Sequence, residues 1–547
     1  MQPGTNSKFA WPDDGVTRVP YFVYEDADLY RLEQERVFRG PVWNYLGLEI
    51  EIPSPGDYIT NYVGDTPVIV IRDEAGEINA LVNRCAHKGS MVCYQPSGNA
   101  TALTCPYHNW VYGLDGGLKS VAFRHGVRGE GGMPADFDLA AHGLVRLKVA
   151  TIRGMIFGSF ATETMPLETF LGARLVAHVE RTLNRPYRIL GRCSQTMHCN
   201  WKLYAENSRD TYHPSLLHSF ATMFKLNRLS ASGGIEMDEA GWHHLVFARR
   251  HTDQASADYD AAGLRASDDG YRLADPRLIE DWLEWDDGIT NSIMTLFPCL
   301  NLQQSLNTVA IRQMVPKGPF ESELFWTFLG FVEDDAEKTQ IRLRQSNLFG
   351  PAGFISLEDG AIGEFVQKAI RGEWDQTTII EMGGRGVGPS PKTRTTETSV
   401  RGFWRTYRRF MDLWHERRRR NAGGRGCACG DRGFARALRS YDRQRRSRSM
   451  AALLHRDRPI PGDDARESPQ GLADRRDVLR RARHDGGPRH RAPARNSLRA
   501  ACLSPHRRFD PDRRCAGRQL RGREPLPHSA HQCRWRGRHL RGGPLPR

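Results

Sequence analysis

The sequence predicts an α+β protein built of a small antiparallel β domain followed by a larger domain of sheet and helices. From Val42 onward, short alternating apolar runs are broken by turn residues, a pattern typical of antiparallel strands. Farther along, the apolar runs at 293–315 and 323–331 lack the strand–helix alternation of a parallel sheet, and helical periodicity follows them. The 547 residues are enough for two or three domains, each with its own core.

The expected elements follow the changes in periodicity along the chain. A lead-in at 1–41 contains a predicted helix at 26–39, whose apolar positions recur at helical spacing. The β domain is expected at 42–159, with strands at 42–50, 58–63, 67–72 and 78–82. The larger domain is expected at 160–414, where an antiparallel sheet grips a long helix. Helices are predicted there at 336–347, 357–371 and 398–413.

Two short strings in the β domain carry the strongest chemical signal. Cys85-Ala-His87 is followed, after 17 intervening residues, by Cys105-Pro-Tyr-His108. Each string pairs a thiolate with an imidazole, so together they supply the two sulfur and two nitrogen ligands of a Rieske [2Fe–2S] centre. Zinc also takes Cys₂His₂ sets, although zinc fingers usually keep the two Cys together and the two His together. Zinc binding, or Cys residues without any ligand, is the alternative interpretation.

A second set of possible metal ligands lies in the segment 200–218. His213 and His218 follow Asp210, and two His with a carboxylate form the facial triad of non-haem Fe(II) oxygenases. The two His are five residues apart, so a regular helix would not point both toward one cavity, but Pro214 indicates a break that realigns them. Taken alone, such a pair more often serves capping, packing or surface chemistry than metal binding. An electron carrier in the same chain favours iron, because its electrons need a destination.

With both ligand sets in place, residues 19–414 resemble the large (α) subunits of Rieske non-haem iron aromatic ring-hydroxylating oxygenases. The resemblance implies a Rieske domain, a helix-grip (START-like) catalytic domain with mononuclear Fe(II), and His213 and His218 as iron ligands. In this family the third ligand follows a Gly-Pro-Ala-Gly-Phe string, which is matched at 350–354, and counting on from it gives Asp359. The adjacent Glu358 is the rival ligand, and either carboxylate is also explained as a solvated acid at a helix start.

Asp210 matches the bridging aspartate of the family and is therefore expected to take part in catalysis. By this resemblance it links His213 to His108 of a neighbouring subunit and holds both imidazoles in the orientation that ligation needs. A plain surface Asp would tolerate replacement by Asn. The chain departs from the family at Lys88, where Arg is common; Lys lacks the planar fork of Arg, which affects the fine tuning of the cluster.

The resemblance implies hydroxylation of an aromatic ring with O₂ and electrons from NAD(P)H. The chain has no glycine-rich dinucleotide fingerprint after a strand, so a separate ferredoxin or reductase is expected to deliver the electrons. Strings at 18–22, 123–127 and 132–137 are similar to the branch of anthranilate 1,2-dioxygenase and salicylate 5-hydroxylase. We therefore expect an aromatic carboxylate with an ortho substituent as substrate, with 1,2-dioxygenation of anthranilate before 5-hydroxylation of salicylate. We also expect a small β subunit on a trimeric α core (α3 or α3β3). A Rieske electron-transfer protein without oxygenase activity is the alternative, but it would need no second large domain.

The net charge of +14 is concentrated in one segment. Residues 415–547, the Arg-rich tail, hold 36 Arg, no Lys and 13 acidic residues, a net +23, so the first 414 residues carry −9. With one Tyr, one Ile and one Val, the tail cannot bury enough apolar surface to fold and is predicted to be disordered. A basic arm for nucleic acid is one interpretation. The absence of Lys favours an out-of-frame read-through instead, because codons can be chosen for 490–509 whose shifted frame is similar to the β subunit of the family.

Three further features bear on location. The sequence contains no run of 18 apolar residues, its 11 Cys are irregularly spaced, and its first residues lack a basic stretch followed by an apolar one. We expect a protein of the reducing cytoplasm, without a membrane or nucleic-acid partner.

Overall fold

The protein was analysed as a computed structural model, which describes residues 9, 11, 15–250, 261, 263 and 271–413. The Arg-rich tail, with the disorder and read-through predicted for it, lies outside the described residues. Within those residues, no helix combines the length and apolar character needed to cross a bilayer.

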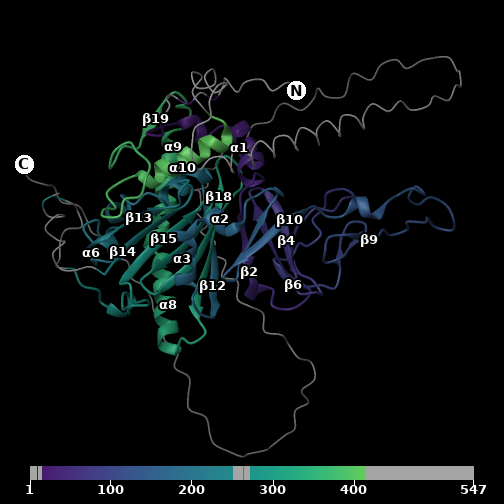
Figure 1. Cartoon of the computed structure of the whole chain (residues 1–547), viewed down its shortest axis with the longest axis horizontal. Coiled ribbons are helices and arrows are strands. Elements are labelled where there is room, and N and C mark those ends of the chain that lie inside the picture. The colour runs from purple at the N-terminus through teal and green to yellow at the C-terminus, as the bar shows by residue number, and fades with distance from the viewer. Residues whose placement is uncertain are drawn as a thin grey trace, which may run out of the picture. The chain divides into compact units, whose positions relative to one another are not determined.

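The first large sheet is antiparallel and seven-stranded, with the strand order β2-β11-β10-β5-β4-β3-β6 (Figure 1). Its strands are β2 (Asn44–Leu48), β3 (Asp57–Val63), β4 (Thr66–Arg72), β5 (Ile78–Val82), β6 (Ser97–Asn99), β10 (Arg146–Ile152) and β11 (Met155–Ser159). A separate three-stranded sheet consists of β7 (Leu103–Thr104), β8 (Val111–Tyr112) and β9 (Leu118–Ser120). The four strands predicted before residue 83 are confirmed, with ends that differ by at most two residues.

The second large sheet is also antiparallel and seven-stranded, in the order β12-β18-β17-β16-β15-β14-β13 (teal in Figure 1). Its strands are β12 (Tyr187–Met197), β13 (Gly233–Met237), β14 (His244–Arg249), β15 (Ile289–Leu296), β16 (Leu300–Ser305), β17 (Thr308–Pro316) and β18 (Ser322–Phe331). A short pair of β1 (Arg18–Pro20) and β19 (Thr377–Ile379) connects the lead-in to a late segment. The predicted antiparallel sheet is therefore confirmed.

The helices pack around these sheets. They are α1 (Ala27–Glu33), which continues as a π-helical turn (Gln34–Phe38), α2 (Leu167–Leu171), α3 (Ala173–Thr182), α4 (Trp201–Asn207), α5 (Pro214–Leu217), α6 (Ser219–Met223), α8 (Ala336–Phe349), α9 (Phe354–Ala369) and α10 (Thr398–Met411). Single 3₁₀ turns lie at Tyr21–Tyr24, Glu49–Glu51, Leu139–His142 and Pro276–Leu278. The predicted helices at 26–39, 336–347, 357–371 and 398–413 are all present. On α10, the rings of Phe403 and Phe410 pack against Phe297, which follows β15.

The helix α9 lies very close to strand β12 because it carries a glycine at the contact. A Cβ added at Gly360 would lie 2.4 Å from Nε2 of Gln195. Gln195 also clamps the first turn of α9, since its Nε2 donates to the Ser356 carbonyl (3.0 Å) and its Oε1 accepts from the Ser356 hydroxyl (2.6 Å). This close approach carries Asp359, the next residue back from Gly360, into the interior, where it is 6% exposed.

Buried apolar side chains of the two large sheets form one continuous core. It joins Val68 and Phe157 of the first sheet to Trp201 and Leu296 near the second. A second, smaller core lies beneath the two Cys-His strings and contains Cys85, Cys105, Trp110 and Tyr112. The two Cys-His strings are therefore supported by a hydrophobic core of their own.

Candidate active site

The two Cys-His strings fold into loops with the same backbone hydrogen bonds. In the first, the Cys85 N–H donates to the Ser90 carbonyl (2.8 Å), and the Cys85 carbonyl accepts from the Gly89 N–H (3.0 Å). In the second, the Cys105 N–H donates to the Trp110 carbonyl (2.9 Å), and the Cys105 carbonyl accepts from the Asn109 N–H (3.0 Å). The fifth residue of each loop, Gly89 or Asn109, has a positive φ (75° and 51°), which Gly and Asn adopt at low cost.

The four predicted cluster residues lie in two loops whose cysteines share one small core and whose histidine rings are neighbours. Both Cys are buried, whereas the rings of His87 and His108 lie 4.5 Å apart between centroids on the outer side. Trp110 stacks on His87 at 4.9 Å with the ring planes 2° apart, as expected of a shielding aromatic residue. Burial and the neighbouring His87 and Lys88 lower the pKa of His108, which favours the neutral imidazole that a metal requires. The paired thiols and imidazoles thus fit a Cys₂His₂ cluster.

A helix break is present in this segment, but Pro214 begins a helix and the break itself lies at His218, where it orients the two histidines of the second site. Helix α5 begins at Pro214 and ends after one turn, because His218 has φ −84° and ψ 75°, outside the helical region. Helix α6 then starts at Ser219. The rings of His213 and His218 come to lie 5.3 Å apart at an angle of 74°. The interruption of the helix therefore lets two histidines that are five residues apart point toward the same site, which a regular helix would not allow.

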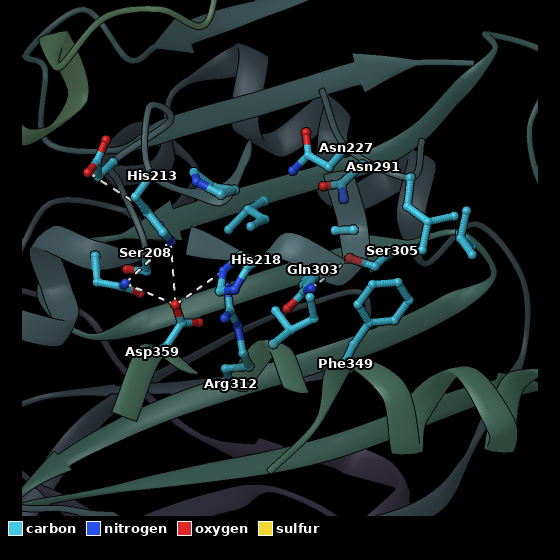
Figure 2. Close-up of a pocket in the computed structure, with 18 of the residues that line it drawn as sticks. Ser208, His213, His218, Asn227, Asn291, Gln303, Ser305, Arg312, Phe349 and Asp359 are labelled. Atoms are coloured by element: carbon cyan, nitrogen blue, oxygen red, sulfur yellow. Dashed lines mark hydrogen bonds and ion pairs between the residues drawn. The ribbon is translucent and has the colours of Figure 1, made fainter. Parts of the chain in front are cut away.

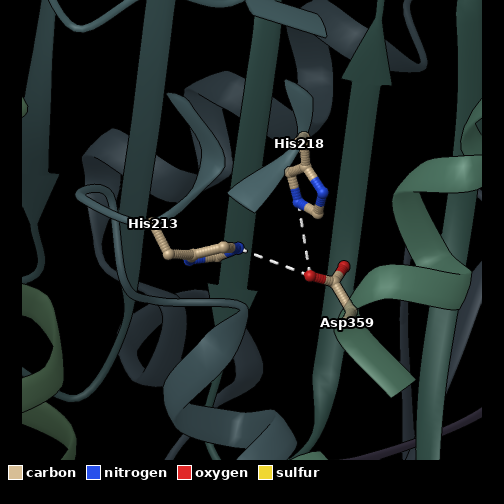
Figure 3. Close-up of side chains that lie close together, drawn as sticks. All are labelled: His213, His218 and Asp359. Carbon is tan, nitrogen blue, oxygen red and sulfur yellow. Dashed lines mark ion pairs between the residues drawn. The ribbon is translucent and has the colours of Figure 1, made fainter. Parts of the chain in front are cut away.

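His213, His218 and Asp359 converge on one point (Figure 3). Asp359 Oδ1 lies 3.4 Å from His213 Nε2 and 3.3 Å from His218 Nε2. One potential ligand atom of each residue lies within 4.8 Å of the other two. Two imidazole nitrogens and one carboxylate oxygen on one side of a pocket are the donors of the facial triad, so the residues fit mononuclear iron.

Glu358, the rival of Asp359, occupies a different position. Its Oε2 lies 2.7 Å from Nδ1 of His218, on the far side of the ring from Asp359. Neither carboxylate is in the first turn of α9, so the interpretation as helix-start acids is wrong. The side-chain amide of Asn207, a residue that the sequence analysis did not single out, donates to Asp359 Oδ1 (3.0 Å).

Asp210 lies beside the other predicted iron ligand. Its Oδ2 is 3.6 Å from Nδ1 of His213, longer than a hydrogen bond, and this nitrogen has no hydrogen-bond partner among the described residues. Burial lowers the pKa of His213, but the nearby carboxylates of Asp210 and Asp359 outweigh burial and raise it to about 9. Burial raises the pKa of Asp359, but the two histidines outweigh this and hold it far below its usual range. The site therefore keeps its carboxylate ionised and available to a cation.

The triad lies in the wall of a pocket whose other side is the second sheet (Figure 2). Neighbouring strands present polar side chains to it: Asn291 from β15, Gln303 and Ser305 from β16, and Arg312 from β17. Its apolar lining residues are Ile293, Leu226, Leu306, Phe349 and Ile355. The pocket therefore offers an apolar surface with a few polar groups, which is typical of a site for a small organic molecule.

Arg312 is the most unusual of these residues. It is 4% exposed, and its Nη1 donates to the Tyr204 hydroxyl (2.9 Å). Its guanidinium lies over the Trp326 ring (5.1 Å to the centroid), but Nε and Nη2 have no hydrogen-bond partner among the described residues. Trp326, directly opposite on β18, has an equally unpartnered indole Nε1 and also lines the pocket. Arg312 was not among the predicted site residues, although one charge within the apolar run of a predicted strand was a usable signal.

Comparison with known proteins identifies the family. Residues 176–413 match the ring hydroxylating alpha subunit (catalytic domain), and residues 42–128 match the Rieske [2Fe-2S] domain. The alpha 2 subunit of the terminal oxygenase component of terephthalate 1,2-dioxygenase from Comamonas sp. is 47% identical over 401 residues, which are 73% of this chain and 97% of that protein. The chain belongs to this family. It is a Rieske non-haem iron aromatic ring-hydroxylating oxygenase α subunit, whose cofactors are a [2Fe–2S] cluster and mononuclear iron.

Two other relatives belong to the branch expected from the sequence. The anthranilate 1,2-dioxygenase large subunit of Burkholderia cepacia is 42% identical, over 73% of this α subunit and 95% of the relative. The large oxygenase component of salicylate 5-hydroxylase from Ralstonia sp. is 40% identical, over 73% and 96%. The fold is that of a naphthalene 1,2-dioxygenase from Rhodococcus sp. bound to indole, with a TM-score of 0.60 and 22% identity, over 72% of this chain and 94% of that one.

A buried carboxylate one turn before Asp210 makes the stability of this α subunit depend on pH. Glu206 accepts hydrogen bonds from the hydroxyl of Tyr24 and from Trp404 Nε1, and burial raises the pKa of Glu206 to about 7. The pKa of Glu206 in the folded state lies above its ordinary value of 4.5. The contribution of Glu206 to stability is therefore fully present below pH 4.5 and is lost as the pH rises through 7. We expect Glu206→Gln to raise the free energy of unfolding at pH 8, by up to about 3 kcal/mol, and to leave it nearly unchanged at pH 5, as measured by denaturant unfolding at both pH values. An equal change at both pH values would contradict this assignment.

Proposed function

We propose that this α subunit hydroxylates an aromatic carboxylate, and that Arg312 binds the carboxylate. The single observation that carries the proposal is the buried guanidinium in the pocket, with Nε and Nη2 unpartnered among the described residues. A buried cation without an anion is costly, and a carboxylate is the planar partner that a guanidinium binds through two parallel hydrogen bonds. Trp326 Nε1 supplies a further donor to the same anion.

The residues of the two metal sites divide the remaining work. We propose that Cys85, His87, Cys105 and His108 hold the cluster, and that His213, His218 and Asp359 hold the iron. When bound, the cluster supplies single electrons and the ferrous ion supplies open positions for O₂ beside the substrate ring. The apolar wall of the pocket, including Phe349 and Ile355, covers the ring and excludes water.

The assembly completes the proposed site. Asp210 lies at Nδ1 of His213, where it is positioned to join the iron site to His108 of a neighbouring subunit. This arrangement requires an α3 core, with a small β subunit in an α3β3 form. A ferredoxin or an NAD(P)H reductase delivers the electrons.

Three relatives support the substrate class. Their names state terephthalate, anthranilate and salicylate, all of which are benzoic acids with a second substituent. Of the three, the terephthalate relative has the highest identity to this chain, so anthranilate is no longer preferred. It is kept as one of the three acids to be tested. We propose a substituted benzoate, with the panel deciding the second substituent.

Replacing Arg312 by Met tests the proposal directly. Loss of one partner from a buried ion pair costs about 3–5 kcal/mol, so kcat/KM for benzoates is expected to fall at least about 100-fold. The ligand-free variant should be no less stable than the parent, because a buried unpaired charge is removed. Product analysis with the redox partners, O₂ and the three acids gives the activity, and thermal unfolding gives the stability.

The matched control is a buried arginine whose guanidinium forms ion pairs with carboxylates. Arg342 is fully buried and paired with Asp334 and Glu284, so Arg342→Met should lower stability by about 3–5 kcal/mol. Full activity of R312M on all three acids would refute the assignment of the carboxylate site. Equal activity on an uncharged aromatic ring would refute the substrate class.

A further inference from the structure

The ring of His218 is held between two consecutive carboxylates of α9. On one side, its Nε2 lies 3.3 Å from Asp359 Oδ1, at the point where the three proposed ligands converge. On the other side, its Nδ1 lies 2.7 Å from Glu358 Oε2. The two nitrogens of one imidazole therefore face acids that are adjacent in sequence.

The short contact with Glu358 decides which nitrogen of the ring carries a proton. An ionised carboxylate only accepts hydrogen bonds, so the short contact with Glu358 needs a proton on Nδ1. A neutral ring with its proton on Nδ1 has the lone pair on Nε2, which is the form that binds a metal. Glu358 thus selects the tautomer that the facial triad needs.

His213 lacks an equally tight anchor. Its Nδ1 stands 3.6 Å from Asp210 and has no hydrogen-bond partner among the described residues. The side chain of Glu358 is 30% exposed, and that of His218 is 5% exposed, so the anchor lies between the buried ligand and solvent. His218 is therefore held by a hydrogen bond from within this chain, whereas the carboxylate nearest to Nδ1 of His213 lies beyond hydrogen-bond distance.

We infer that Glu358 is a positioning residue, which holds His218 in the Nδ1–H form and presents its Nε2 to iron. The inference rests on the proposed iron ligands. It gives the two consecutive acids separate roles, with Asp359 as the ligand and Glu358 as the residue that orients a ligand.

The affinity of the purified α subunit for Fe(II) tests this inference without turnover. The iron is captured anaerobically by a chelator, and the cluster absorbance reports that the fold is intact. Glu358→Leu keeps the volume but loses the acceptor, and it is expected to bind Fe(II) about 10–100-fold more weakly. Glu358→Gln keeps an oxygen that accepts from Nδ1–H, and it should retain most of the parent affinity. If Glu358 only filled space, the two variants would bind Fe(II) equally well.

Glu364→Leu is the matched control, because this acid lies on the same helix with a similar side-chain exposure of 33% and pairs with Lys368. Its Fe(II) affinity should equal that of the parent. Unchanged affinity in E358L, with loss of iron in Asp359→Ala, would overturn the inference and leave the proposed ligands intact. Retention of iron in D359A, with complete loss in E358L, would make Glu358 the ligand and overturn both.

Discussion

Replacing Asp359 by alanine is expected to leave a protein with its cluster but without mononuclear iron. The carboxylate is buried, stays ionised and is the only acid among the three residues of the triad, so its loss removes the negative charge that faces the cation. Iron content should fall from about three to about two atoms per chain. Hydroxylation should fall by more than about 1000-fold, because the remaining pair of imidazoles leaves the metal site open.

Iron analysis, cluster absorbance and product formation together test this result. Glu373→Ala, which removes an exposed acid just after α9, serves as the control and should keep both the iron and the activity. A D359A protein with three iron atoms per chain would show that Asp359 is not a ligand. Loss of the cluster as well would point to a failure of folding, which the absorbance detects.

Replacing Asp210 by asparagine is expected to stop electrons from reaching the catalytic iron while both metals stay bound. Asn keeps the size of Asp but loses the charge beside His213 Nδ1. We expect reoxidation of a prereduced cluster, after mixing with substrate and O₂, to slow by about 100-fold or more. Rapid-mixing absorbance measures this rate in a single turnover, and iron analysis confirms the metal content.

The control removes a negative charge elsewhere in the same chain. Asp136→Asn changes an exposed acid of the β domain and should leave the reoxidation rate unchanged. Full activity of D210N would identify Asp210 as an ordinary surface residue. Slow reoxidation together with iron loss would mean that Asp210 holds the metal and does not connect the two sites.

The parts of the site that were predictable have local signals. Each Cys-His string is one loop, and the realignment of His213 and His218 comes from a helix break within the same short segment. Short-range geometry of this kind can be inferred from spacing and residue type. The antiparallel strands before residue 83 were predictable for the same reason, because turn residues and alternation lie close together.

The roles that escaped prediction depend on distant segments. Glu358 and Asp359 are neighbours in sequence, but about 100° apart around a helix, and only the position of α9 against β12 decides which one faces the triad. That position requires Gly360 and the clamp from Gln195, which is more than 160 residues away. Arg312 faces the pocket because of the register between β16 and β17. A single strand does not reveal which of its faces is buried.

The shared interior has a consequence for how the molecule comes apart. Val68 and Phe157 pack in the same apolar cluster as Trp201 and Leu296. Separating the two domains would therefore expose apolar surface of both to water. Heating should therefore unfold both domains in one cooperative step. The loss of the cluster absorbance should coincide with the change in tryptophan fluorescence. A fragment ending near residue 160 would expose this surface and precipitate, which makes the full chain the right starting material for spectroscopy.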